Sequence, residues 1–235
     1  MRRRMVLLVA VLACAAGAAQ AGPPTKAARR PADKGTFRSC ENGKCHRIPV
    51  LSGRNAAKTE LRADPLDKPS GDIWIKAENL GEEVKVHIYK PDGSFDDAAL
   101  AKLDDLFRDP KTGAVRAVRS ELYEQLSRIY DKFGADGTRP VVLVSGFRYQ
   151  ERDSSRHYHA SAMDIRVPGV SIYEMYRYAE SLDAGGMGLG IYPTGGFIHV
   201  DFRAPGEPSY RWTDYSGHGG KKPTGRTQPA RKPTS

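Results

Sequence analysis

The stretch GFIHVDF at residues 196–202 alternates apolar and polar side chains, with the period of two that is typical of a half-buried β-strand. Its apolar side chains would face a core, and His199 and Asp201 would share the opposite face. The stretch AMDIRV at residues 162–167 has the same period and places Asp164 and Arg166 on its polar face. The sequence therefore predicts two strands that bury apolar side chains behind and present ionisable side chains in front.

Other segments complete an α+β domain. Alternating or β-branched runs predict three further strands, at residues 73–77, 84–89 and 141–144. Apolar side chains at helical spacing predict three helices, over residues 97–108, 122–133 and 171–182. The glycine-rich run at residues 186–190 is expected to form a turn before the last strand. This order of elements predicts an antiparallel sheet with helices packed on one side.

The two ends of the chain differ in composition from its middle. Residues 1–21 combine three arginines, an apolar run and Ala19-Gln20-Ala21, as a secretory signal with an A-x-A cleavage site does. Lipid attachment at Cys14 is the alternative. The expected division is a signal peptide (1–21), a basic flexible linker (22–38), an N-terminal extension (39–83), the main domain (84–215) and a basic disordered tail (216–235).

Two cysteines, Cys40 and Cys45, remain once the signal is removed. The Asn-Gly pair between them favours a turn, and an oxidising compartment favours a disulfide that closes this small loop. A metal pair with His46 is the alternative, although a zinc site of that kind would need further cysteines.

The net charge of +9 lies mainly at the ends of the 235-residue chain, because residues 39–215 are slightly acidic. A domain that reads nucleic acid needs a basic face with stacking aromatic side chains, so nucleic acid is disfavoured as a partner. The hydrophobic content of 39% excludes a protein with several membrane spans, and no stable membrane insertion is expected. We expect a monomer.

Three side chains fit an open zinc site. Two imidazoles and a carboxylate, with a fourth position for water, form a site that can support catalysis, and His157, Asp164 and His199 fit that composition. Zinc would activate the water and polarise a substrate carbonyl. Asp201 shares a face with His199 and is the candidate general base.

Alternatives remain open for several of these side chains. Asp164 could instead pair with Arg148 or Arg166, and these two arginines are also candidates to hold a substrate carboxylate or an oxyanion. If the backbone around it is extended, His159 lies on the same face as His157. His159 is therefore an alternative ligand or a second catalytic candidate.

Short motifs along residues 84–213 resemble those of a known family. The motifs are SGFR (145–148), SRH (155–157), AMD (162–164), PGVS (168–171), GGMG (185–188), YP (192–193), GFIHVD (196–201) and RW (211–212). They resemble the zinc-dependent peptidoglycan peptidases, the D-alanyl-D-alanine carboxypeptidase and murein endopeptidase family, whose fold is shared with the hedgehog signalling domain. Within this family, the motifs most resemble those of the exported murein endopeptidase-like branch.

The resemblance implies roles for particular residues. It implies Zn²⁺ bound by His157, Asp164 and His199, a substrate carboxylate held by Arg148, and Ser155 on the substrate side. The implied substrates are peptidoglycan stem peptides, which contain D-amino acids. The enzyme would therefore act outside the cytoplasm, in the periplasm or cell envelope, and its zinc peptidase domain would span residues 84–215.

Three positions depart from the family pattern. Ala160 stands where the family usually has Gly, and only eight residues separate Arg148 from His157. Gly196 stands where carboxypeptidase relatives place the base, so the base must be Asp201, His159 or a residue that the sequence does not reveal.

The resulting hypothesis is a secreted zinc metallopeptidase that hydrolyses an amide bond in peptidoglycan stem peptides or crosslinks. A D,D-carboxypeptidase that releases terminal D-Ala is one alternative. A non-catalytic wall-binding module that retains the metal site is the other.

Overall fold

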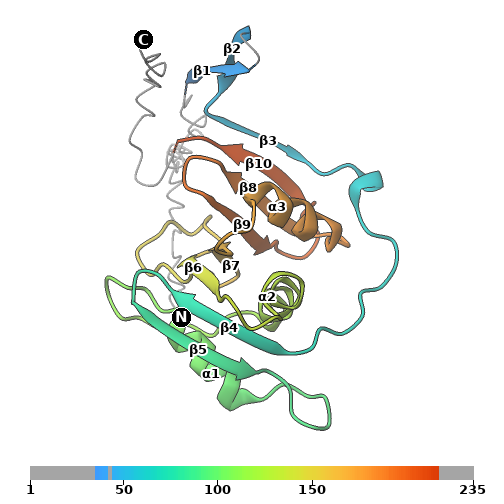
Figure 1. Ribbon diagram of the computed structural model, residues 1–235, viewed down its shortest axis with the longest axis vertical. Helices are drawn as coiled ribbons and strands as arrows, with labels where there is room; N and C mark the ends of the chain where they lie inside the picture. Colours follow the sequence, from blue (N-terminus) through green and yellow to red (C-terminus); the bar gives the residue numbers. More distant parts are fainter. Residues whose placement is uncertain (1–34, 42–43, 217–235) are drawn as a thin grey trace, which may run out of the picture. The chain divides into compact units, whose positions relative to one another are not determined.

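The computed structural model describes residues 35–41 and 44–216 (Figure 1). The predicted signal peptide, most of the linker and nearly all of the tail lie outside these residues. Within the described part of the chain, no helix has the length and apolar character needed to cross a membrane.

Three α-helices and ten strands form the described elements. The helices are α1 (Asp97–Leu106), α2 (Ser120–Phe133) and α3 (Ile172–Ser181), and a short 3₁₀ helix covers Lys58–Glu60. The strands are β1 (Thr36–Glu41), β2 (Lys44–Pro49), β3 (Leu51–Asn55), β4 (Asp72–Ala77), β5 (Glu82–His87), β6 (Val141–Ser145), β7 (Ala162–Arg166), β8 (Met187–Tyr192), β9 (Phe197–Phe202) and β10 (Tyr210–Asp214). Every helix and strand that the sequence predicts is present, while β1, β2, β3, β8 and β10 were not predicted.

The main sheet is mixed, which corrects the prediction of a purely antiparallel sheet. Its eight strands follow the order β3-β10-β8-β9-β7-β6-β4-β5, and β1 pairs separately with β2. The pairs β4–β6 and β8–β10 are parallel, and the others are antiparallel. Alternation of side chains shows which face a residue occupies but not the direction of its strand, so the sequence could not reveal the two parallel pairs.

The three helices form one layer against the sheet. Phe107 at the end of α1 meets Tyr123 of α2 edge to face, with ring centroids 5.5 Å apart. Phe133 of α2 meets Tyr178 of α3 in the same way, at 5.4 Å. The buried strand side chains belong to the same apolar core as these helices, which confirms that the aliphatic face of the sheet is the covered one.

Strand β8 occupies the glycine-rich run that was expected to be a turn. Gly188 pairs with Asp201 and Gly190 with His199 across the β8–β9 ladder. A Cβ on Gly188 would lie 2.1 Å from the Asp201 carboxylate, and one on Gly190 would lie 2.3 Å from the Trp212 ring. The strand needs glycine at both positions because neighbouring side chains lie across it.

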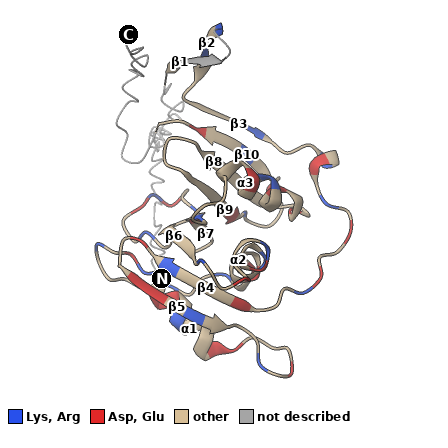
Figure 2. Ribbon diagram, in the orientation of Figure 1, with Lys and Arg blue, Asp and Glu red and all other residues tan. Residues whose placement is uncertain are grey.

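The hairpin of β1 and β2 places Cys40 opposite Cys45 in its register. The side chain of Cys40 lies outside the described ones, so the disulfide stays a prediction. Elsewhere, Lys and Arg are interspersed with Asp and Glu along the described elements (Figure 2).

Candidate metal centre

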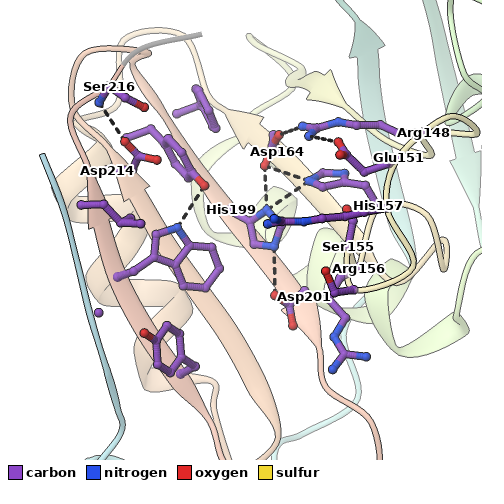
Figure 3. A pocket seen from close by; sticks show the side chains of 18 of the residues that line it. Arg148, Glu151, Ser155, Arg156, His157, Asp164, His199, Asp201, Asp214 and Ser216 are labelled. Atoms are coloured by element: carbon purple, nitrogen blue, oxygen red, sulfur yellow. Dashed lines mark hydrogen bonds and ion pairs between the residues drawn. The ribbon is translucent and has the colours of Figure 1, made fainter. Parts of the chain in front are cut away.

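His157, Asp164 and His199 come together on the face of the sheet away from the helices (Figure 3). Asp164 on β7 and His199 on β9 are directly opposite each other in the ladder. His157 lies in the turn that precedes β7, and all three side chains are buried. One potential ligand atom from each residue lies within 4.8 Å of the other two. The sequence-predicted trio is therefore assembled.

Hydrogen bonds on the outer side of each imidazole show which nitrogen faces the cluster. His157 Nδ1 lies 2.7 Å from the Gly146 carbonyl and must donate to it, which leaves the Nε2 lone pair free. His199 Nε2 lies 3.0 Å from an Asp201 carboxylate oxygen and donates there, which leaves Nδ1 free. His199 Nδ1 is 3.2 Å from His157 Nε2 and 2.8 Å from Asp164 Oδ1. Three acceptor atoms thus face one another.

Three buried acceptors at these distances require a positive charge between them. Without a metal, a proton takes that place: although burial opposes the charge, hydrogen bonds to Asp164 and Asp201 raise the pKa of His199 to about 9. Burial lowers the pKa of His157, and the two imidazoles hold the pKa of Asp164 below its usual value despite its burial. A proton bridges two acceptors, whereas a divalent cation can bind all three. The donor set of two imidazoles and one carboxylate fits zinc.

Arg148 contacts the cluster, and its side chain, 34% exposed, also lines the cleft, so its predicted role in holding a substrate carboxylate stays a prediction. Its Nη2 donates to Asp164 Oδ2 at 2.5 Å, and its Nε donates to Ser145 Oγ at 2.8 Å. Its Nη1 lies 3.4 Å from a Glu151 carboxylate oxygen. Arg148 therefore fixes the oxygen of Asp164 that points away from the imidazoles and leaves Oδ1 for the metal.

The remaining sequence candidates lie in different places. Ser155 lines the cleft over the cluster. His159 is exposed, its Nε2 contacts the Asp153 carbonyl at 2.6 Å, and it does not line the cleft. Arg166 forms an ion pair with Glu78 and is also absent from the cleft lining. The structure thus brings neither His159 nor Arg166 to the site.

Asp201, the candidate base, contacts the nitrogen of His199 that points away from the other two ligands. Its side chain is 3% exposed, and its second oxygen lies 3.2 Å from Arg203 Nε. Burial opposes its charge, but the hydrogen bond from His199 holds the pKa of Asp201 below its usual value. This position suits a residue that orients His199 better than one that exchanges protons with water.

The cluster opens into a cleft of about 610 Å³ with two chemically different walls. One wall consists of Arg148 and the loop that follows it, residues 149–156. Its charged side chains are Arg148, Glu151, Arg152 and Arg156. The other is aromatic and includes Tyr192, Phe197, Tyr210 and Trp212. Trp212 lies against His199, with ring centroids 4.9 Å apart, and donates from Nε1 to the Tyr192 hydroxyl at 3.0 Å.

The sequence analysis assigned no role to Glu151, Arg152 or Tyr210. The sequence showed only that the loop containing the first two is short, and it singled out neither residue. Leu51 and Gly53 of β3 also line the cleft, although β3 lies far from the motifs in the sequence. Only the pairing of β3 with β10 brings it there.

The sequence was compared with known protein families, proteins and structures. Residues 72–205 match the family model described as peptidoglycan L,D-endopeptidase MepK. The chain belongs to this family. A peptidoglycan L,D-endopeptidase MepK of Escherichia coli (strain K12) is 31% identical over 136 residues, which cover 52% of this chain and 71% of the relative. A probable peptidoglycan L,D-endopeptidase MepK of Haemophilus influenzae is 31% identical over 135 residues, covering 52% and 70%. No solved structure matches the chain.

Membership of the MepK family confirms the resemblance drawn from the short motifs and makes the chain a member of a peptidase family. The matched region contains all three cluster residues, in agreement with a metal-dependent peptidase. The family match begins at residue 72 with β4, the strand that pairs with β6 inside the sheet.

Proposed function

We propose that the chain is an exported zinc metallopeptidase that hydrolyses an amide bond in peptidoglycan stem peptides or crosslinks. The observation that carries this proposal is the convergence of three acceptor atoms, from His157, Asp164 and His199, at the floor of an open cleft. Membership of the MepK family supports the peptidoglycan substrate.

Each residue of the cluster has a defined role in this proposal. His157 Nε2, Asp164 Oδ1 and His199 Nδ1 would hold zinc, which when bound polarises a carbonyl and lowers the pKa of water. Arg148 orients Asp164 by a hydrogen bond to Oδ2, and Asp201 orients His199 by a hydrogen bond from Nε2.

The cleft walls suit a peptide that carries carboxylates. Arg152 is exposed at the loop wall and is available to a substrate carboxylate, whereas Arg156 forms an ion pair with Glu207. The aromatic wall offers apolar surface to the aliphatic part of a stem peptide. Because the relatives are named L,D-endopeptidases, we propose an amide bond between an L-centre and a D-centre as the one cleaved.

The test is digestion of isolated murein sacculi by residues 22–235, with the products analysed by mass spectrometry. We expect new muropeptides cut at an L–D amide bond, and none with the His199→Ala variant. Release of free D-alanine alone would favour a D,D-carboxypeptidase. Sedimentation with murein and no cleavage would favour a wall-binding module, and either result contradicts the proposal.

The proposed location is the periplasm or cell envelope, reached through the signal peptide at residues 1–21. The disulfide between Cys40 and Cys45 belongs to the same proposal, and their opposite positions in the β1–β2 register support it. The division into linker, extension, peptidase domain and tail, the monomeric state, and the lack of nucleic-acid and membrane partners also remain proposals.

A further inference from the structure

Cleavage of an amide bond needs a group that accepts a proton from water, and Asp201 is poorly placed for it. We propose that Glu151, on the loop before His157, is this group. The inference rests on the proposed peptidase function. Among the described residues that line the cleft, the carboxylates are Glu151, Asp164, Asp201 and Asp214.

Two of these carboxylates are engaged with the cluster itself. Asp164 directs one oxygen at the imidazoles and gives the other to Arg148. Asp201 accepts the proton of His199 Nε2 and lies next to Arg203, with its side chain 3% exposed. The Asp201 oxygen next to Arg203 makes no hydrogen bond, but it is buried, so neither carboxylate presents an oxygen to water in the cleft.

Asp214 lies too far from the cluster, because its strand is not next to the one that carries His199. It is on β10, and β8 separates β10 from β9, the strand that carries His199. Strands in a sheet are about 4.8 Å apart, so the backbones of β10 and β9 are separated by roughly 10 Å. The large ring of Trp212 spans this gap to His199, but the short side chain of Asp214 cannot. Asp214 is also buried, and it accepts a hydrogen bond from the backbone of Ser216.

Glu151 differs from the other three in both access and position. Its side chain is 36% exposed, so water can reach the carboxylate. Arg148 holds it through Nη1, while Nη2 of the same guanidinium holds Asp164. Since both nitrogens belong to one planar group, Glu151 is tethered close to the cluster, and it lines the cleft. Figure 3 shows its carboxylate next to Arg148, joined to it by a dashed line.

The proton transfers balance with Glu151 in this role. The oxygen of water forms a bond to the substrate carbonyl carbon, and Glu151 takes the proton that this oxygen loses. The C–N bond then breaks, and the proton passes from Glu151 to the departing amine nitrogen. Glu151 returns to its carboxylate form, and the net reaction converts an amide and water into a carboxyl group and an amine.

A purely structural role for Glu151 predicts a different outcome. If Glu151 served only to hold Arg148, its loss would free Arg148 from one partner and disturb Asp164. Metal affinity would then fall together with activity. A proton acceptor, in contrast, affects kcat and leaves both metal binding and peptide binding intact.

The test compares Glu151→Gln with the wild-type mature chain on a purified crosslinked muropeptide. We expect kcat to fall by about 10²- to 10⁴-fold, the usual contribution of a general base. We expect KM, the zinc dissociation constant and the Kd for the uncleaved muropeptide each to stay within about twofold. Glu151→Asp, which keeps a carboxylate, should retain more activity than Glu151→Gln. Glu174→Gln, on the exposed surface of α3, is the matched control and should behave as wild type.

A Glu151→Gln variant with wild-type kcat would overturn the inference while leaving the proposed function intact. Weakened zinc binding in that variant would overturn it as well, in favour of the structural role. A wild-type chain that fails to cleave any muropeptide would instead overturn the proposed function, and the inference with it.

Discussion

At the scale of single residues, the site depends on which atom of each ligand is already occupied. The Gly146 carbonyl accepts a hydrogen bond from His157 Nδ1, and the Asp201 carboxylate accepts one from His199 Nε2. Arg148 donates a hydrogen bond to Asp164 Oδ2. Each contact fixes a tautomer or a carboxylate orientation, so the free lone pairs point inward without reorganisation. The binding strength of the centre therefore depends on residues that never touch the metal.

Replacing Asp201 with Asn tests this dependence. An amide can still accept the proton of His199 Nε2 but carries no charge, so His199 becomes a weaker donor to the metal. We expect zinc affinity to fall about 10- to 100-fold, measured by competition with a chromogenic chelator. Asp97→Asn, exposed on α1, should bind zinc as the wild type does. If Asp201 is the general base, as the sequence suggested, Asp201→Asn would keep its zinc affinity and lose kcat.

The residues that the sequence could and could not assign differ for a physical reason. A period of two places His199 and Asp201 on one face, and the same rule places Asp164 on the face of its own strand. The rule does not say which ring nitrogen a neighbouring carboxylate contacts, so it could not separate a base from an orienting residue. His159 was a candidate only if its backbone were extended. His159 lies instead in a turn, and the residue after it, Ala160, has a left-handed φ of 48°.

At the scale of elements, β8 shows where patterns in the sequence lose their information. Glycine has no side chain, so a strand with glycine at alternate positions has no polar or apolar alternation to read. Strand β8 forms because β9 and β10 pair with it on either side. Its glycines leave room for Asp201 and Trp212, so the same feature that hid the strand is needed by the site.

Gly188→Ala tests the role of this strand. The new Cβ would lie 2.1 Å from Asp201 Oδ2, so that carboxylate must move away from its position beside His199. We expect the free energy of unfolding to fall by about 1–3 kcal/mol from overpacking, and zinc affinity to fall as well. Gly190→Ala, which meets Trp212 instead, should lower stability without a comparable loss of zinc affinity. Urea unfolding measures the stability of each variant, and chelator competition measures its zinc affinity. Equal zinc affinities in both variants and the wild type would contradict the account.

At the scale of the whole described molecule, one face of the sheet is covered and the other is used. The helices bury the aliphatic face, and the hydrophobic pattern of the sequence was enough to predict this layer. The cleft on the other face gathers the loop at 149–156, the strands β7 to β10 and the distant β3. Contacts between such separated segments leave no local pattern, which explains why the cluster could be predicted and the cleft walls could not.

The central claim is that three atoms, from His157, Asp164 and His199, share one zinc ion. The most direct measurement is the zinc K-edge X-ray absorption spectrum of the mature chain loaded with one equivalent of Zn²⁺. The account predicts nitrogen and oxygen neighbours at about 2.0–2.2 Å, with the scattering signature of two imidazoles, and the loss of that signature in His199→Ala. A chain that binds no zinc, or a spectrum with sulfur neighbours at about 2.3 Å, would contradict it.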